Sequence, residues 1–184
     1  MPILTDRTIY RGRPAEKRIP KEEAAYDLLE RAGIDFERVD HAAANTIEEC
    51  FEVDELLEME ICKNLFLCNA QKNAFYLLLM PGKKKFRTAE VSKQIGSARL
   101  SFAPYEELER LLDLTPGSVT VLGLMNDREN KVKLIIDSEV LEAPYFGCHP
   151  MINTSSLRFP TRDLTDKLLP EMGHTYIEVF LTGE

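Results

Sequence analysis

Residues 75–80 read Phe-Tyr-Leu-Leu-Leu-Met and are apolar at every position. Successive side chains of a β-strand point to opposite faces of a sheet, so a strand of this kind must be covered on both faces. The whole apolar stretch, residues 74–81, is far too short to span a bilayer. The segment therefore predicts a central strand of a sheet that has helices packed on it.

The rest of the chain mixes helix and strand patterns without strict alternation. Apolar spacing, caps and turn residues predict helices over 24–32, 46–57, 88–95, 104–112 and 162–172. Strands are predicted over 36–41, 63–68, 118–122, 131–136, 143–148, 155–159 and 176–181. These elements predict a mixed α+β (α/β) fold, with one mixed central sheet flanked by helices in a single domain over residues 21–184. Residues 1–20 contain three prolines and few apolar residues, which predicts a flexible basic arm.

Charge is distributed unevenly along the sequence. The net charge of −8 argues against a nucleic-acid partner, but residues 21–60 hold fourteen acidic and three basic residues. Residues 83–99 hold six basic residues against Glu90 alone, and residues 7–18 hold five against Glu16 alone. Such a distribution attracts a polyanion to one side and repels it from the other. A solvated helix face beside a basic tail explains the same counts equally well.

Cofactor and compartment signals are sparse. The four cysteines show no Cys-x-x-Cys spacing, and phosphate-binding and dinucleotide-binding glycine motifs are missing from the sequence. We therefore expect no metal, no cofactor and no membrane partner. Free thiols and the lack of a secretory signal predict a cytoplasmic protein. Two histidines, His41 and His174, match no motif and are expected at the surface.

Three short motifs follow one another along the chain. Residues 61–67 read Ile-Cys-Lys-Asn-Leu-Phe-Leu, residues 115–120 read Thr-Pro-Gly-Ser-Val-Thr, and Gly147-Cys148-His149-Pro150 is followed by Asn153-Thr154-Ser155. No motif is specific alone. In this order and spacing they resemble the prolyl-tRNA editing (YbaK/ProX-type) deacylase family, whose members hydrolyse amino acids wrongly esterified to tRNA. The likeness runs from about residue 22 to residue 181.

Lys63 is the leading candidate for chemistry. In a regular strand it shares a face with Leu65 and Leu67, where an ammonium is costly unless it meets an anion or reaches water. A lysine that extends to water at a sheet edge is the plain alternative. The resemblance implies instead that Lys63 lines the active site near the terminal adenosine of the tRNA. It also implies catalytic positions at Gly147 and His149.

The resemblance implies further contacts to the substrate. The expected substrate-binding residues are Asn64, Gly117, Ser118, Val121, Pro150, Asn153 and Thr154. From the distribution of charge, the expected contacts to the tRNA backbone are Lys83, Lys84, Lys85 and Arg87. The family loop has the form Gly-x-x-x-Pro, but here the fifth position is Val121, which removes a φ restraint and restores a backbone donor. This departure leaves the amino acid specificity open.

An aminoacyl ester is already reactive, so an editing enzyme needs only to hold the carbonyl, polarise it and place a water. The resemblance favours a free-standing hydrolase acting on the acceptor end of Ala-tRNA(Pro), with prolyl-tRNA synthetase or an elongation factor as protein partner. Two alternatives stay open. One is the same hydrolysis on Cys- or Ser-tRNA, and the other is a non-catalytic tRNA-binding or regulatory module on the same fold.

Overall fold

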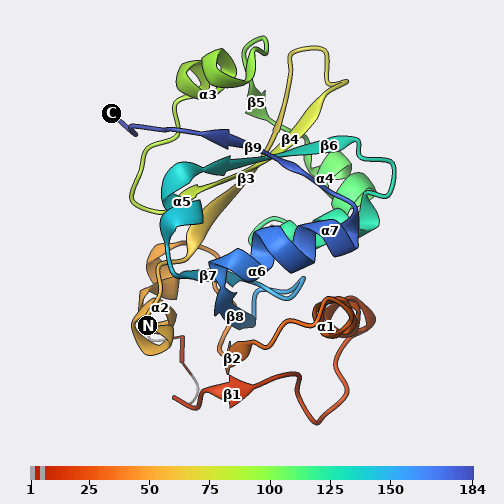
Figure 1. The fold of residues 1–184 in the computed structure, drawn as a ribbon, viewed down its shortest axis with the longest axis vertical. Coiled ribbons are helices and arrows are strands. Elements are labelled where there is room, and N and C mark those ends of the chain that lie inside the picture. Colours follow the sequence, from red (N-terminus) through yellow and green to blue (C-terminus); the bar gives the residue numbers. More distant parts are fainter. Residues whose placement is uncertain (1–2, 5–6) are drawn as a thin grey trace.

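The computed structural model describes residues 3–4 and 7–184 of the chain. Its strands form two sheets, one in the upper half and one in the lower half of Figure 1. Helices accompany both sheets, so the mixed α+β class is confirmed. The expectation of one central sheet is corrected to two, because periodicity identifies a strand but not the strand beside it.

The upper sheet is the mixed sheet that the sequence predicts. Its order is β5 (Ser101–Phe102), β3 (Cys62–Cys68), β4 (Phe75–Pro81), β6 (Val132–Asp137) and β9 (Tyr176–Val179). Strand β4 is antiparallel to β3 and parallel to β6. Leu77 and Leu79 of β4 belong to one buried cluster, whereas Leu78 and Met80 belong to another. The apolar strand is therefore covered on both faces, as its sequence predicts.

The lower sheet is antiparallel throughout. Its order is β1 (Tyr10–Arg11), β2 (Glu37–Asp40), β8 (Ser155–Pro160) and β7 (Tyr145–Cys148). The largest core cluster includes Phe146 and Phe159 of this sheet together with Leu77 and Leu134 of the other. The two sheets therefore share one core.

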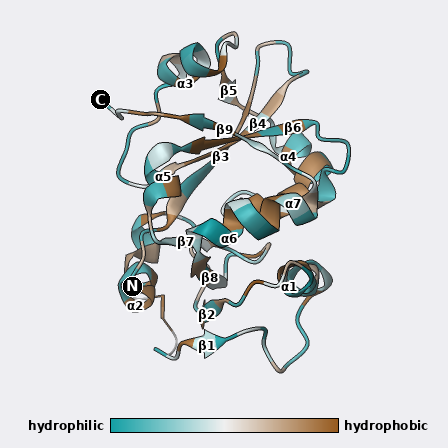
Figure 2. Cartoon of the chain, in the orientation of Figure 1, coloured by the Kyte–Doolittle hydropathy of each residue, from teal (hydrophilic) through white to brown (hydrophobic). Residues whose placement is uncertain are grey.

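Helices complete the domain. They are α1 (Pro20–Arg31), α2 (Phe51–Leu57), α3 (Thr88–Ile95), α4 (Tyr105–Leu112), α5 (Ser138–Glu142), α6 (Thr161–Asp163) and α7 (Leu169–Met172), with 3₁₀ turns η1 (Glu48–Cys50) and η2 (Val121–Asn126) and a π turn η3 (Leu164–Leu168). Figure 2 shows hydrophobic residues on the central strands and α7, whereas α3 is mainly hydrophilic. Among the described residues, no helix combines the length and apolar character needed to cross a membrane.

Local capping signals agree with the structure. The Thr46 hydroxyl accepts from Glu49 N and the Glu49 carboxylate accepts from Thr46 N, both at 3.3 Å, which is a capping box. The helix expected over 46–57 is realised as η1 followed by α2. Helix α3 ends at Gly96 in the left-handed region, at φ 68°.

The strand expected over residues 118–122 is wrong. Ser118 Oγ donates to Thr115 O at 2.9 Å and closes a turn. The Thr120 hydroxyl then accepts from Leu122 N at 3.3 Å and caps η2. Leu122 and Leu124 of this helical turn are fully buried. A strand and a helical turn could both bury this apolar run, and capping by the Thr120 hydroxyl favours the turn.

The basic arm expected over residues 1–20 is attached to the domain in its described part; residues 1–2 and 5–6 lie outside the described residues. Strand β1 pairs with β2. Arg13 binds Glu23 and Asp27 at 2.6 and 2.9 Å, and Arg18 binds Asp40 at 3.0 Å. These ion pairs neutralise part of the acidic segment, so the two charge runs partly satisfy each other.

Candidate functional site

A cavity of about 400 Å³ collects residues from all three motifs. Four residues predicted from the sequence line it: Lys63, Asn64, Gly117 and His149. The start of β3, the loop before η1, the loop before η2 and the end of β7 supply its walls. Segments more than eighty residues apart in the sequence therefore meet around one space.

Lys63 is half-buried and lies opposite Met80 in the β3–β4 ladder. Its Nζ donates to Lys84 O at 2.5 Å. Within the described part of the chain, the ion pairs include none to Lys63. An ammonium has three donors, so this one keeps two for a group in the cavity.

Asn64 follows on the same strand and presents an acceptor. Its Nδ2 donates to Cys62 O at 3.1 Å. Its Oδ1 is buried and accepts no hydrogen bond from the described residues. Because an unsatisfied buried carbonyl oxygen costs free energy, this atom is suited to accept from a ligand hydroxyl or amine.

His149 is 8% exposed at the end of β7. Its Nδ1 donates to Ser155 O at 2.8 Å. Burial and, to a smaller extent, nearby His41 lower the pKa of His149 to about 4, and that hydrogen bond opposes them only in part. The ring is therefore neutral near pH 7 and carries its lone pair on Nε2, which makes it an acceptor rather than a cation.

His41 lies beside the His149 ring, and it was not predicted from the sequence as a site residue. The expectation that His41 and His174 lie at the surface is wrong, since each is 5% exposed. His41 Nδ1 donates to Ala42 O at 2.7 Å, so its Nε2 accepts from Ser156 Oγ at 2.9 Å. His174 is remote from the cavity and contacts Asp127 O at 3.0 Å. Alternation from buried Val39 would have placed His41 on an inward face.

Gly117 lies in the loop before η2, close to Asn45 of the loop before η1. Its φ of +85° lies in the region that favours glycine. A Cβ there would lie 3.5 Å from Asn153 Nδ2 and from Asn45 Oδ1, an ordinary contact distance. Asn153 donates to Ala44 O and to Asn45 Oδ1 at 3.3 and 3.2 Å. Backbone conformation, rather than crowding, therefore explains the glycine.

Six other predicted residues are not among the cavity lining: Ser118, Val121, Gly147, Pro150, Asn153 and Thr154. Val121 is fully buried in the main core, and Ser118 closes the turn described above. Pro150 is buried and Thr154 is exposed, with its carbonyl accepting from the backbone of His41. A Cβ on Gly147 would lie 2.4 Å from Met59 Sδ, so Gly147 packs against that side chain.

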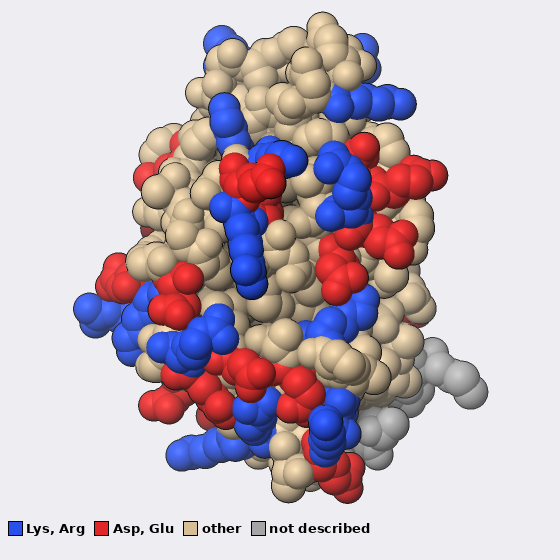
Figure 3. Space-filling view, turned by 90° about the vertical axis from the view of Figure 1, so that its right-hand side faces the viewer, with Lys and Arg blue, Asp and Glu red and all other residues tan. Residues whose placement is uncertain are grey.

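The basic residues divide into two groups. Lys83, Lys85 and Arg87 are exposed. Lys84 is 9% exposed at its side chain and binds buried Asp137 at 2.8 Å, which does not fit the expected contact to the tRNA backbone. The face turned toward the viewer in Figure 3 carries both signs interspersed.

An acidic wall adjoins the cavity. A second hollow of about 750 Å³ shares Ile47 and Ile61 with it, and Lys83 lies on its rim. Its acidic residues are Glu48, Asp54, Glu55, Glu58 and Glu60. Burial raises the pKa of Asp54 to about 7. A polyanion that approaches the cavity is repelled from this side.

Three cysteines line the same cavity as Lys63. Burial raises the pKa of Cys50 to about 11 and that of Cys62 to about 12, and it also raises the pKa of Cys148. All remain neutral thiols near pH 7 and act as small apolar walls. In the described ranges, no group of three or more His, Cys, Asp or Glu side chains is arranged to hold a metal ion.

Solved structures share this two-sheet arrangement. A crystal structure described as a candidate trans-editing enzyme for prolyl tRNA synthetase has a TM-score of 0.64 and 18% identity, over 90% of this chain and 99% of that one. The hypothetical protein APE2540 has a TM-score of 0.65 and 19% identity, over 86% of this chain and 98% of its own. At this identity the likeness defines the fold class alone, that of a small α+β domain.

Sequence comparison defines the family. Residues 41–167 match the family described as the aminoacyl-tRNA editing domain, and the chain belongs to it. The Prolyl-tRNA editing protein ProX of Acetoanaerobium sticklandii is 29% identical over 84% of this chain and 94% of its own length. Prolyl-tRNA synthetase associated domain-containing protein 1 of Mus musculus is 31% identical over 77% of this chain and 87% of its own.

These matches confirm the resemblance drawn from the three motifs. They also confirm the expected enzyme class, a hydrolase that deacylates aminoacyl-tRNA, with mischarged tRNA as the class of substrate. The roles of individual residues, the amino acid removed and the protein partners stay predictions.

Proposed function

We propose that this chain is a free-standing trans-editing hydrolase that cleaves the ester of Ala-tRNA(Pro). One observation carries the proposal: around one small cavity meet a lysine with two donors that bind no described residue, an amide acceptor without a partner among the same residues, and a neutral imidazole. The chain belongs to the editing family, and the names of its relatives refer to prolyl-tRNA.

Each of the three groups has a different task. The Lys63 ammonium attracts the 3′-terminal nucleotide and polarises the ester carbonyl. Asn64 Oδ1 accepts from a ribose hydroxyl or from the α-amino group of the aminoacyl moiety. His149 Nε2 accepts from the attacking water and orients it. Hydrolysis then adds water to the ester carbon and releases the amino acid and the 3′-hydroxyl of the tRNA.

Selectivity follows from the size of the cavity. Its thiol and aliphatic walls include Cys50, Cys62 and Val119, none of which can donate strongly to a polar side chain. A difference of one or two methylene groups supplies only about 1–3 kcal/mol by binding. Hydrolysing a small mischarged residue while a larger cognate residue clashes is therefore the efficient arrangement. This arrangement favours alanine over proline.

The names of the relatives also support prolyl-tRNA synthetase as the protein that precedes this enzyme in the handling of tRNA. An elongation factor competes for the same aminoacylated 3′ end.

The test is a deacylation panel in which tRNA(Pro) carries alanine, serine, cysteine or proline. We expect rapid release of alanine, slower release of serine and cysteine, and protection of proline. Each charged tRNA incubated without enzyme is the control for spontaneous hydrolysis. Faster release of cysteine or serine than alanine would redirect the substrate assignment. If the protein binds every tRNA but hydrolyses none, the assignment as an enzyme is wrong and the protein is a tRNA-binding module.

A further inference from the structure

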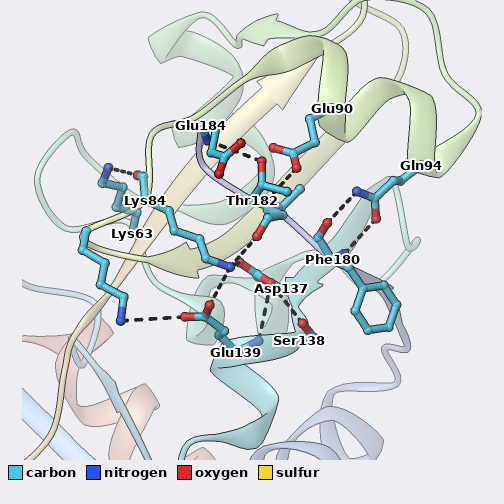
Figure 4. Close-up of polar contacts among 12 residues, drawn as sticks. Lys63, Lys84, Glu90, Gln94, Asp137, Ser138, Glu139, Phe180, Thr182 and Glu184 are labelled. Atoms are coloured by element: carbon cyan, nitrogen blue, oxygen red, sulfur yellow. Dashed lines mark hydrogen bonds and ion pairs between the residues drawn. The ribbon is translucent and has the colours of Figure 1, made fainter.

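Lys84 lies in a run of exposed basic residues, but its own side chain is buried. Its Nζ lies 2.8 Å from Asp137 Oδ2 and 3.1 Å from Glu139 Oε1, and it donates to Leu181 O at 2.5 Å (Figure 4). Asp137 is fully buried. The three ammonium donors of Lys84 thus meet three acceptors inside the protein. No donor is left for a phosphate.

The backbone of Lys84 faces the other way, toward the candidate site. Its carbonyl accepts from Lys63 Nζ at 2.5 Å. Its N–H donates to Pro81 O at 3.2 Å and closes the turn after β4. The carbonyl that holds Lys63 is therefore fixed from two directions, by this turn and by the buried side chain of Lys84.

The C-terminal segment secures the third acceptor. Gln94 of α3 accepts from Phe180 N at 2.7 Å and donates to Phe180 O at 2.9 Å. Glu90 of the same helix accepts from Thr182 N at 2.6 Å. These contacts fix Leu181 O, which lies between them along the chain. Figure 4 shows the segment running between α3 and the Lys84–Asp137 pair.

We propose that Lys84 is a positioning residue for Lys63: its buried contacts to Asp137 and Leu181 fix the carbonyl oxygen that sets where the Lys63 ammonium lies in the cavity. This inference rests on the proposed function, in which Lys63 touches the substrate. Burial lowers the pKa of Lys84, but the hydrogen bonds to Asp137 and Glu139 outweigh that effect and the pKa is raised above its usual value. The ion pair therefore persists at neutral pH.

The test compares Lys84→Met, Lys84→Arg and the double variant Lys84→Met with Asp137→Asn. Removing one partner of a buried pair leaves an uncompensated charge, so the double variant guards against loss of folding. Lys131→Met, which removes an exposed lysine 51% accessible at its side chain and paired with Glu129, is the matched control. Two quantities are measured: the rate at which acetic anhydride modifies Lys63, followed by peptide mass spectrometry, and kcat and KM on Ala-tRNA(Pro).

We expect Lys84→Met and the double variant to acetylate faster at Lys63. We also expect kcat to fall about tenfold with a smaller change in KM, because misplacement of a reacting group by about 1 Å can cost about a hundredfold and the displacement expected here is smaller. Lys84→Arg restores much of kcat, since a guanidinium can still pair with Asp137. Lys131→Met resembles the parent in both measurements.

Unchanged acetylation of Lys63 in a folded Lys84→Met or double variant overturns the positioning role. Faster acetylation of Lys63 with unchanged kcat supports the positioning of Lys63 by Lys84. The same result contradicts the catalytic role that the proposed function gives to Lys63. The acetylation measurement needs no tRNA, so failure of the positioning inference and failure of the proposed function give different results.

Discussion

The imidazole rings of His41 and His149 lie 6.1 Å apart and are tilted by 58°. Ser156 Oγ lies between them, 2.9 Å from His41 Nε2 and 3.4 Å from His149 Nδ1. Burial lowers the pKa of both rings, and the Nδ1 atom of each donates to a backbone carbonyl, so each neutral ring carries its proton on Nδ1 and its lone pair on Nε2. The Ser156 hydroxyl donates a hydrogen bond to His41 Nε2, so the two buried histidines lie side by side without charge.

This arrangement predicts loss of stability in acid. An unfolded histidine has a pKa of about 6.5, whereas that of folded His149 is about 4. Between these values the unfolded state binds more protons at this histidine, so its contribution to the free energy of unfolding falls as pH drops from about 6.5 to about 4. The raised pKa of Asp54, about 7, acts in the opposite direction over the same range, so the contribution of His149 is measured as a difference between two proteins. Urea unfolding across this range is compared for the parent and His149→Asn, which keeps a donor toward Ser155 O. The free energy of the parent should fall relative to that of the variant as pH drops; parallel pH profiles would contradict the prediction.

Lys63→Ala should lower kcat on Ala-tRNA(Pro) by about tenfold or more while the melting temperature stays close to that of the parent. The reason is the loss of an ammonium at the cavity wall that pairs with no carboxylate of residues 3–4 and 7–184. Single-turnover hydrolysis and thermal unfolding measure the two effects. Lys131→Ala removes an exposed lysine on a distant loop as the control. Parent-like turnover by a folded Lys63→Ala protein would make Lys63 a surface lysine in function.

Three exposed basic residues should attract the tRNA rather than act in chemistry. Reversing Lys83, Lys85 and Arg87 to Glu is expected to raise KM for tRNA more than it lowers kcat. The dependence of KM on salt between about 50 and 200 mM should become weaker, because fewer counterions are released on binding. Lys131→Glu with Lys167→Glu is the comparison on other elements. An equal effect of that pair would place the RNA elsewhere.

Gly147→Val should abolish most hydrolysis, but through Met59 rather than by filling the cavity. A Cβ at position 147 would lie 2.4 Å from Met59 Sδ and 2.5 Å from its Cε, so the methionine must move. Overpacking of this kind costs about 1–3 kcal/mol of stability. Met59→Ala in the same chain should recover both melting temperature and turnover. A double variant that is stable yet inactive would show that Gly147 acts on the substrate directly.

Much of the site could be predicted from local sequence. The apolar run of β4 required a covered central strand, and the alternation along β3 placed Lys63 with Leu65 and Leu67 on the face that β4 shares. The order of the three motifs identified the family, and four residues predicted from them line one cavity. Each of these conclusions depends on a pattern within a few residues, or on motif order.

Only the tertiary structure determined which side chains contact one another. Lys83, Lys84 and Lys85 look alike in the sequence, yet only the middle one meets Asp137, which lies fifty-three residues further along the chain. His41 became buried because β8 brings Ser156 to it from a distance of 115 residues. Arg13 of the N-terminal arm pairs with a carboxylate on α1. The strands form two sheets rather than one. Local periodicity determines the face on which a side chain lies, but the free energy of a buried charge or imidazole depends on groups that only folding brings within hydrogen-bond distance.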